Sequence, residues 1–174
     1  MEKKIITLAS LRTRSFSASL DEVLLRDGRR GQRMKIDHPQ AAAVVPFVAE
    51  DEILLVRQYR YALGKETLEI PAGKLDPGET PEECVRRELL EETGYEAGEL
   101  NFLYTYAPAI GYSNELIHIY SARSLKKTKK KIDEREISSV KSYSTRRLRK
   151  MIKKGLLADG KTLLALFFAG IERV

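Results

Sequence analysis

Three glutamates, Glu88, Glu91 and Glu92, are spaced three and four residues apart in a segment whose sequence predicts a helix. That spacing places the three carboxylates within about 100° of one another around the helix axis. Carboxylates so close repel one another and weaken the isolated helix. A solvated acidic face is one interpretation of the cluster. Clustered carboxylate oxygens are also the ligands that Mg²⁺ and Mn²⁺ prefer, and Mg²⁺ is commonly held by a few carboxylates together with substrate phosphates.

The distribution of charge favours a phosphate ligand. The 174-residue chain has 31 Lys and Arg against 25 Asp and Glu, a net charge of +6 and a sequence pI near 9.4. Residues 73–95 alone carry −4, so the rest of the chain carries +10. A basic protein attracts a small polyanion, and an acidic segment within it can hold divalent cations that bind that polyanion. The basic stretches 126–131 and 146–154 lack interleaved aromatic residues, so we expect them to be solvated surface rather than a nucleic-acid site.

The segment around the glutamates is predicted to be a loop followed by a helix. Gly73–Gly78 contains two glycines and a proline and is typical of a loop. Thr80 with Pro81 and Glu83 forms a capping-box pattern, so the helix is predicted to run from Pro81 to about Thr93. Gly94 then provides a C-terminal stop.

The remaining elements predict one domain with a mixed β-sheet and interspersed helices, of the α/β (α+β-like) class, over residues 41–174. The apolar run Ala41–Val48 is typical of a central strand buried on both faces. Further strands are predicted at 52–59, 67–70, 100–106, 115–122 and 137–143, and helices at 144–154 and 161–171. Residues 1–40 are predicted to form an N-terminal strand arm, a hairpin in which Ile5, Leu8 and Leu11 are buried.

The residues around the glutamates match a family motif. Gly73, Glu79 and the run RELLEETGY, Arg87–Tyr95, resemble the Nudix box, G-x5-E-x7-R-E-U-x-E-E-x-G-U. The single departure is Tyr95, where the pattern usually has a bulky aliphatic residue. The resemblance implies the Nudix fold, with a loop–helix–loop motif on a mixed β-sheet. It also implies Mg²⁺-dependent hydrolysis of a nucleoside diphosphate linked to another moiety, with Mn²⁺ as an alternative metal.

The resemblance also assigns roles within the motif. It implies that Glu88 and Glu92 bind the metal and that Glu91 joins or supports them. The backbone carbonyl of Ala72, just before the motif, is expected to reach the metal as well. The residues given a structural role are Gly73 and Gly94 at close turns, and Glu79 and Arg87 as a bracing ion pair.

The flanking sequences resemble the ADP-ribose pyrophosphatase branch of the family. The matching segments are VRQYR (56–60), EIPAGKLDPGE (69–79) and Pro108 with GYSNE (111–115). In that branch a glutamate on the later loop is the general base, and Glu115 is the residue that would take this role. Glu91 is the next candidate. The sequence departs from the branch at Ala109 and Ile110, which stand between Pro108 and Gly111.

Four further residues are expected to bind the substrate. Arg60 matches the substrate-contacting arginine of the branch and is expected to bind a phosphate or the terminal ribose, with Arg57 as a second arginine nearby. Glu69 is expected to accept a ribose hydroxyl or to lie near the metal. An aromatic platform for adenine is expected from Tyr112, with Phe16, Tyr59 and Tyr61 as alternatives.

The resemblance therefore predicts hydrolysis of ADP-ribose, or a related nucleoside diphosphate sugar, to AMP and ribose 5-phosphate. NADH, dinucleoside polyphosphates and GDP-mannose are alternative substrates, and a non-catalytic nucleotide- or RNA-binding module is the alternative of another class. The resemblance also implies a homodimer exchanging N-terminal arms.

The longest apolar stretches, 41–49 and 163–171, are too short for a bilayer, which needs about 20 residues. We therefore expect a cytoplasmic protein without a membrane partner.

Overall fold

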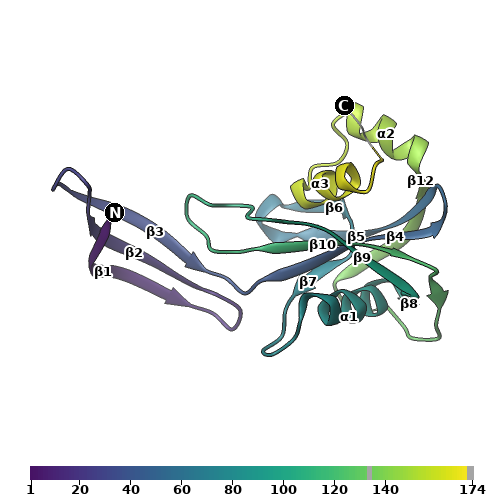
Figure 1. Cartoon of the computed structure of the whole chain (residues 1–174), viewed down its shortest axis with the longest axis horizontal. Coiled ribbons are helices and arrows are strands. Elements are labelled where there is room, and N and C mark those ends of the chain that lie inside the picture. The colour runs from purple at the N-terminus through teal and green to yellow at the C-terminus, as the bar shows by residue number, and fades with distance from the viewer. Residues whose placement is uncertain (133–134, 172–174) are drawn as a thin grey trace. The chain divides into compact units, whose positions relative to one another are not determined.

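The computed structural model describes residues 1–132 and 135–171, and these divide into two units. The smaller unit contains residues 1–40 and 107–116. The larger unit contains residues 41–106 and the chain from 117 onward. Figure 1 labels the elements of both units.

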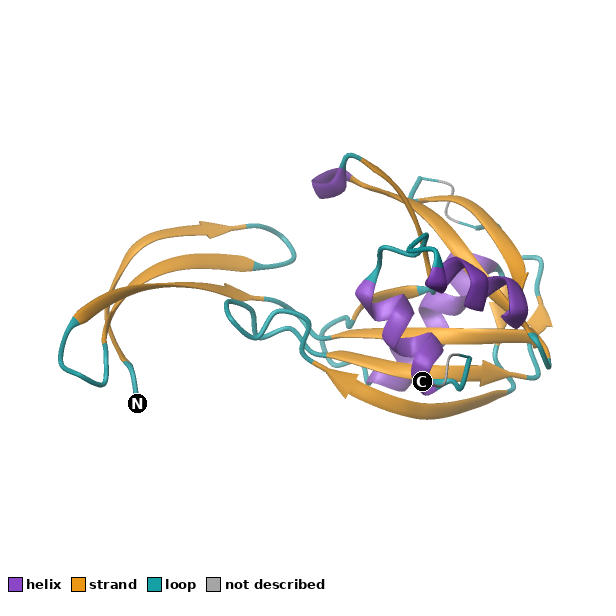
Figure 2. Ribbon diagram, turned by 90° about the horizontal axis from the view of Figure 1, so that it is seen from above, coloured by secondary structure: helices purple, strands orange, loops and turns teal. Residues whose placement is uncertain are grey.

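The smaller unit is a three-stranded antiparallel sheet (Figure 2) in the order β1-β2-β3. Its strands are β1 (Lys3–Arg12), β2 (Ser17–Leu24) and β3 (Arg30–Asp37). The predicted hairpin is present as β2 and β3, which are joined by a turn at Asp27-Gly28, but a second turn between Arg12 and Ser17, which separates β1 from β2, is not predicted from the sequence. In that turn, the hydroxyl of Thr13 donates to the carbonyl of Phe16 over 2.9 Å.

The predicted burial of β1 is also wrong. Every residue of β1 is exposed, and Ile5, Leu8 and Leu11 are 45–62% exposed. The alternation that predicts a half-buried strand does not require the covering layer to come from the same chain. An exposed apolar strand of this kind is available to a second molecule.

A loop from later in the chain is attached to β3. The backbone amide of Ile36 donates to the carbonyl of Tyr112 over 2.7 Å, and Ile36 forms a parallel bridge with Ser113. The side chain of Asn114 accepts from the amide of His38 (2.8 Å) and donates to Asp37 (3.1 Å). Residues 107–116 thus belong structurally with the N-terminal strands.

The larger unit is built on a mixed sheet in the order β12-β5-β4-β10-β9, in which β10 runs parallel to β4. Two short strands extend it, β6 pairing with β5 and β7 with β4. The bounds of these strands are β4 (Ala41–Ala49), β5 (Glu52–Arg60), β6 (Lys65–Glu69), β7 (Ala72–Lys74), β9 (Glu99–Tyr106), β10 (Ile117–Arg123) and β12 (Ile137–Ser144). A separate pair is formed by β8 (Tyr95–Glu96) and β11 (Lys126–Lys127), and a 3-10 turn, η1, spans Tyr61–Leu63.

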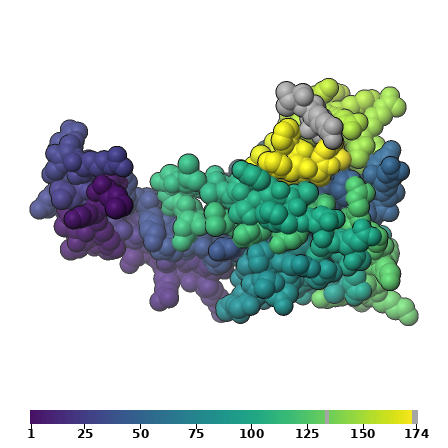
Figure 3. Space-filling view, in the orientation of Figure 1, coloured from purple at the N-terminus to yellow at the C-terminus, as the bar shows by residue number. Residues whose placement is uncertain are grey.

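Helices cover both faces of this sheet, with α1 (Pro81–Thr93) on one face and α2 (Thr145–Lys153) and α3 (Gly160–Phe168) on the other (Figure 1). Alternate residues of β4 enter two cores, since Ala42 and Val44 pack with α1 residues, whereas Ala43 and Val45 pack with residues of α2 and α3. In Figure 3 the yellow residues near the C-terminus lie directly against the teal and green residues of the middle of the chain. The prediction that the 41–48 strand is buried on both faces is confirmed.

Three predicted boundaries differ from the structure. The predicted loop 73–78 begins with strand β7, because its backbone pairs with β4. The predicted strand 115–122 starts only at Ile117, which leaves Glu115 in the loop of the smaller unit. The basic segment 126–131 includes the short strand β11. Among the described residues, no helix is long and apolar enough to cross a membrane.

Candidate active site

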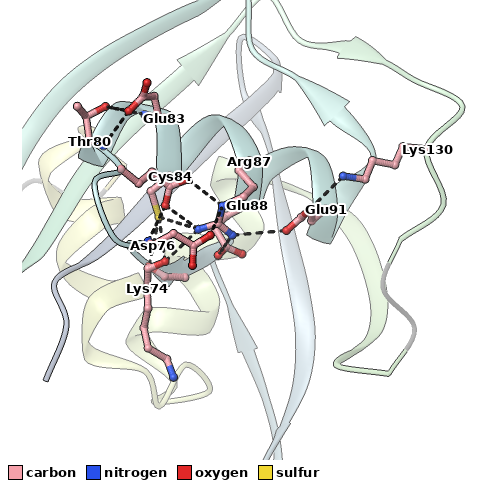
Figure 4. A network of polar contacts seen from close by, with 11 residues as sticks. Lys74, Asp76, Thr80, Glu83, Cys84, Arg87, Glu88, Glu91 and Lys130 are labelled. Carbon is pink, nitrogen blue, oxygen red and sulfur yellow. Dashed lines mark hydrogen bonds and ion pairs between the residues drawn. The ribbon is translucent and has the colours of Figure 1, made fainter. Parts of the chain in front are cut away.

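The predicted helix α1 is confirmed, together with both of its caps (Figure 4). Thr80 and Glu83 form the full capping box, in which each side chain accepts from the other residue's backbone amide. Gly94 ends the helix with φ 74°, a left-handed conformation that favours glycine. These caps fix where the helix begins and ends, and hence which of its side chains face the turn before it.

Arg87 is the centre of the polar network in Figure 4. Its guanidinium donates to both carboxylate oxygens of Glu79 (2.8 and 2.9 Å) and to the carbonyl of Lys74 (3.0 Å). This bidentate ion pair holds the pKa of Glu79 down at about 2 and raises that of Arg87. Arg87 thus fastens the loop before α1 to the helix, which is the geometry expected of a bracing pair.

Glu88 lies directly against the turn that precedes the helix. A Cβ atom placed on Gly73 would lie 1.7 Å from Oε1 of Glu88, so only glycine leaves room for this carboxylate. Arg87 donates to the same oxygen over 2.6 Å. Burial, the dominant cause, raises the pKa of Glu88, although Arg87 opposes the shift.

Glu92 is the most buried of the three glutamates, with 7% of its surface exposed. The backbone amide of Ala72 donates to its Oε2 over 3.2 Å. Burial and then the charge of Glu88 raise the pKa of Glu92 to about 8, while Ala72, Lys161 and Arg60 lower it. The structure thus brings Ala72, Glu88 and Glu92 together at one end of β7.

Glu91 points toward a different partner. Its carboxylate is half-exposed and pairs with Lys130 (3.2 Å) and with Arg87 (3.5 Å), as Figure 4 shows. Among the described residues, no three His, Cys, Asp or Glu side chains are already arranged as a metal cluster. The donor chemistry nevertheless fits Mg²⁺ or Mn²⁺, since Glu92 is a carboxylate whose pKa is raised first by burial and then by the neighbouring Glu88.

A second polar network lies at the ends of β5 and β6. Arg60 donates from Nε and one terminal nitrogen to the two oxygens of Glu69, over 2.7 and 2.6 Å. Glu69 is 2% exposed, and Lys161 of α3 contacts its Oε2. Burial acts to raise the pKa of Glu69, but the contacts with Arg60 and Lys161 together outweigh it and hold the pKa at about 2. Arg60 and Glu69, both predicted to bind substrate, are thus brought together.

Three polar residues of this network that the sequence does not predict lie at the start of α3: Asp159, Lys161 and Thr162. Asp159 is the N-cap of α3, where its carboxylate accepts from the amide of Thr162 over 3.1 Å. The hydroxyl of Thr162 accepts from the amide of Ile70, two residues before Ala72, over 2.9 Å. Asp159 as an N-cap residue is a local signal that could have been found in the sequence. The contact of Thr162 with Ile70, 92 residues earlier, could not have been predicted from such a signal.

The other predicted residues make contacts of their own. Arg57 makes an exposed ion pair with Glu66 over 3.8 Å. Tyr112 and Glu115 belong to the smaller unit, where Tyr112 is half-exposed and Glu115 lies 3.4 Å from Nδ1 of His38. The ring of His38 stacks on Phe16 with centroids 6.1 Å apart. Cys84 is fully buried on α1, as predicted for a core residue.

Comparison with known proteins gives a consistent result. The NUDIX domain family matches residues 37–166. A methanol dehydrogenase activator of Bacillus methanolicus is 35% identical over 98% of this chain and 94% of its own length. An ADP-ribose pyrophosphatase of Bacillus subtilis (strain 168) is 34% identical, covering 88% of this chain and 84% of its own. A GDP-mannose pyrophosphatase of Citrobacter koseri is 34% identical, covering 79% and 76%.

A solved structure has the same fold. The crystal structure titled ADP compounds hydrolase superposes with a TM-score of 0.80 at 25% sequence identity. The superposition covers 96% of this chain and 92% of the other. The predicted fold, a mixed sheet flanked by helices with a loop–helix motif, is therefore confirmed.

Proposed function

The chain belongs to the Nudix family, and from that premise we propose that it hydrolyses the pyrophosphate bond of ADP-ribose or a related nucleoside diphosphate sugar. The products would be AMP and ribose 5-phosphate. One observation carries the proposal: Glu88 and Glu92 converge on Ala72 and Gly73 of β7, where Glu92 is buried beside a second carboxylate. A buried carboxylate next to a second, partly buried one is suited to a divalent metal ion, and Arg87 contacts only one oxygen of the second.

We propose Mg²⁺ as the metal, with Mn²⁺ as a substitute. Glu88, Glu92 and the carbonyl of Ala72 would hold it, and Glu91 would join them or support them. When bound, the metal neutralises phosphate charge and activates a water molecule for attack on phosphorus. Gly73 keeps the Glu88 carboxylate in place, and the Arg87–Glu79 pair keeps the loop against the helix.

Other side chains act on the substrate and on the proton. Arg60, half-exposed at the end of β5, is proposed to bind a phosphate oxygen. Glu115 is proposed as the general base that accepts a proton from the attacking water, and Glu91 is the alternative. Tyr112 is proposed to contact the adenine, with Phe16 as the other aromatic candidate of the same unit. Arg57 and Glu69 remain proposed substrate-binding residues, and Gly94 is proposed to have the structural role of a close turn at the end of α1.

A coupled assay tests the reaction. Purified protein with Mg²⁺ is offered ADP-ribose, GDP-mannose, NADH and a dinucleoside polyphosphate, and phosphate is measured after a phosphatase removes it from the products. We expect the highest kcat/KM with ADP-ribose and loss of turnover in EDTA. The Glu92→Gln variant should lose turnover but stay folded. Absence of turnover with every substrate would instead support a non-catalytic nucleotide- or RNA-binding module.

A second candidate function is activation of a methanol dehydrogenase. The observation that favours it is the extent of the match to the Bacillus methanolicus activator, which spans 98% of this chain. Methanol oxidation by such a dehydrogenase should be measured with and without this protein. If the wild type accelerates it and Glu92→Gln does not, activation depends on hydrolysis, whereas equal acceleration would indicate a binding effect alone.

We also propose that the protein is a cytoplasmic homodimer. The exposed apolar side chains of β1 support the assembly, because a second copy could cover them. Sedimentation or light scattering at several concentrations tests it. A monomer at all concentrations would contradict the proposal.

A further inference from the structure

Lys161 is a nearly buried lysine that the proposed reaction does not use. Its side chain is 11% exposed, and it comes from the first turn of α3, on the face of the sheet opposite to α1. Its ammonium group contacts Oε2 of Glu69 and lies 2.9 Å from Oδ2 of Asp159. A lysine loses hydration when it is buried in this way, so its partners must compensate.

Glu69 connects this lysine to Arg60. Both oxygens of Glu69 bind Arg60, Oε2 also contacts Lys161, and Oε1 accepts from the hydroxyl of Thr67 over 2.5 Å. The Glu69 carboxylate therefore fixes Nε and one terminal nitrogen of Arg60. Contacts with Lys161 and Thr67 hold the same carboxylate in place. Within the described residues, the other terminal nitrogen of Arg60, Nη1, makes no hydrogen bond or ion pair.

The charges of this network balance. Arg60 and Lys161 carry two positive charges, and Glu69 and Asp159 carry two negative ones. The network lies close to the proposed metal site, because Thr162, which follows Lys161, binds the amide of Ile70, and the amide of Ala72 two residues later binds Glu92. Without Lys161 the network would have a charge of −1 beside a site that must accept a pyrophosphate. The buried charge of Glu69 would then depend on Arg60 alone.

We propose that Lys161 is a positioning residue for the pyrophosphate, because through Glu69 it fixes the Arg60 guanidinium with Nη1 directed to a ligand. This inference rests on the proposed hydrolysis of a nucleoside diphosphate sugar. It adds a specific role for the C-terminal helix, which lies outside the motif segment 73–95. Arg60 contacts the phosphate, and Lys161 acts only through Glu69 and Arg60.

Steady-state kinetics of four proteins test the proposal. These are the wild type, Lys161→Met, Lys161→Arg and the control Lys154→Met, which changes an exposed lysine at the end of α2. For ADP-ribose with saturating Mg²⁺, Lys161→Met should raise KM about tenfold, the effect of weakening one charge-assisted hydrogen bond, with kcat changed much less. Lys161→Arg should restore most of the affinity, and Lys154→Met should behave as the wild type.

A double-variant cycle separates positioning from a general loss of structure. Arg60→Ala and Lys161→Met should each raise KM, and the double variant should be no worse than Arg60→Ala alone. If the two effects on KM multiply instead, Lys161 does not act through Arg60 and the proposal is overturned. Lys161→Met with the KM of the wild type would overturn it too.

Two controls keep the test interpretable. Titration of the protein with AMP, followed by calorimetry without metal, gives a binding readout that does not need turnover, and Lys161→Met should weaken it in parallel with KM. If Lys161→Met does not fold, the comparison of Lys161→Arg with Lys161→Gln replaces it. If the wild type does not hydrolyse any pyrophosphate, the proposed function fails; if it does and the Lys161 variants leave KM and AMP binding unchanged, only this inference fails.

Discussion

Glu92 combines burial with the proximity of another carboxylate, and both make its charged form unfavourable. Its pKa is raised to about 8 in the metal-free protein, so the side chain is largely protonated at neutral pH. A divalent cation reverses this preference, because it attracts the ionised carboxylate. Metal binding at this residue is therefore also a deprotonation.

We expect metal affinity to rise as pH increases toward 8, where Glu92 loses its proton. Binding of Mn²⁺ at pH 7 should release close to one proton, which calorimetry in buffers of different ionisation enthalpy measures. Above pH 9 the release should vanish. The Glu92→Gln variant should bind the metal weakly and release no proton from this position. Proton release that is the same at pH 7 and pH 9 would contradict the prediction.

The Glu92→Gln variant should also be more stable than the metal-free wild type at pH 7. The raised pKa means that ionisation of Glu92 favours the unfolded chain above pH 4.5, by at most about 3 kcal/mol at pH 7. The neutral amide removes this penalty. The difference in stability between Glu92→Gln and the wild type should shrink below pH 4.5, where Glu92 is neutral in both the folded and the unfolded chain. Urea unfolding at pH 7 and pH 4 measures this difference.

Gly73 shows how a residue without a side chain contributes to the site. A methyl group there would overlap the carboxylate of Glu88, so Gly73→Ala should displace Glu88 and weaken Mn²⁺ binding at least about tenfold, the equivalent of 1.4 kcal/mol. Electron paramagnetic resonance of free Mn²⁺ measures the affinity. Gly160→Ala is the matched control, because nothing lies within 4 Å of a Cβ at that position. Equal affinity of the two variants would sink the argument.

At the scale of elements, local signals predicted α1 well. The capping box, the proline at the first turn and Gly94 are short-range patterns, and the structure contains each of them. Helical spacing alone groups Glu88 with Glu92, whereas Ala72 could be added to them only through the family resemblance. The network of Glu69 with Lys161 could not be predicted, because it joins β6 to the start of α3, 92 residues later.

The stabilisation that the contact between β6 and α3 provides should depend on pH. The pKa of Glu69 is about 2 in the folded protein and about 4.5 when unfolded, so its ionised form stabilises the fold above pH 4.5. That contribution, about 3 kcal/mol, should be lost as pH falls from 4.5 to 2. As the pH falls through this interval, the free energy of unfolding of the wild type should therefore decrease toward that of Glu69→Gln. Glu66→Gln, which changes an exposed glutamate, should track the wild type at every pH.

At the scale of the whole molecule, the N-terminal strands were the element least well predicted. Alternating apolar residues in β1 indicated a buried face, yet the described chain does not cover them. The sequence pattern records that a face is apolar, but it does not record which molecule packs against it. The proposed homodimer gives this face a partner.

A charge on β1 should disrupt that assembly. Leu8→Glu places a carboxylate on an exposed apolar strand and should weaken dimerisation at least about tenfold, since burying a leucine stabilises by about 1.5–3 kcal/mol. Leu156→Glu, at a leucine of the larger unit that is also exposed (61% against 48% for Leu8), should leave the dimer intact. Light scattering across a dilution series distinguishes the two. A wild type and Leu8→Glu of the same mass at all concentrations would refute the prediction.

The attachment of the 107–116 loop to β3 has a kinetic consequence. Asn114 and Tyr112 tie this loop to the strands of the smaller unit, and the loop carries Glu115. A dimer contact that fixes the N-terminal strands therefore also fixes the loop that carries Glu115, the proposed general base. The reaction velocity should then not be proportional to enzyme concentration: turnover per molecule should decline on dilution, and its half-maximum should fall at the dissociation constant of the dimer.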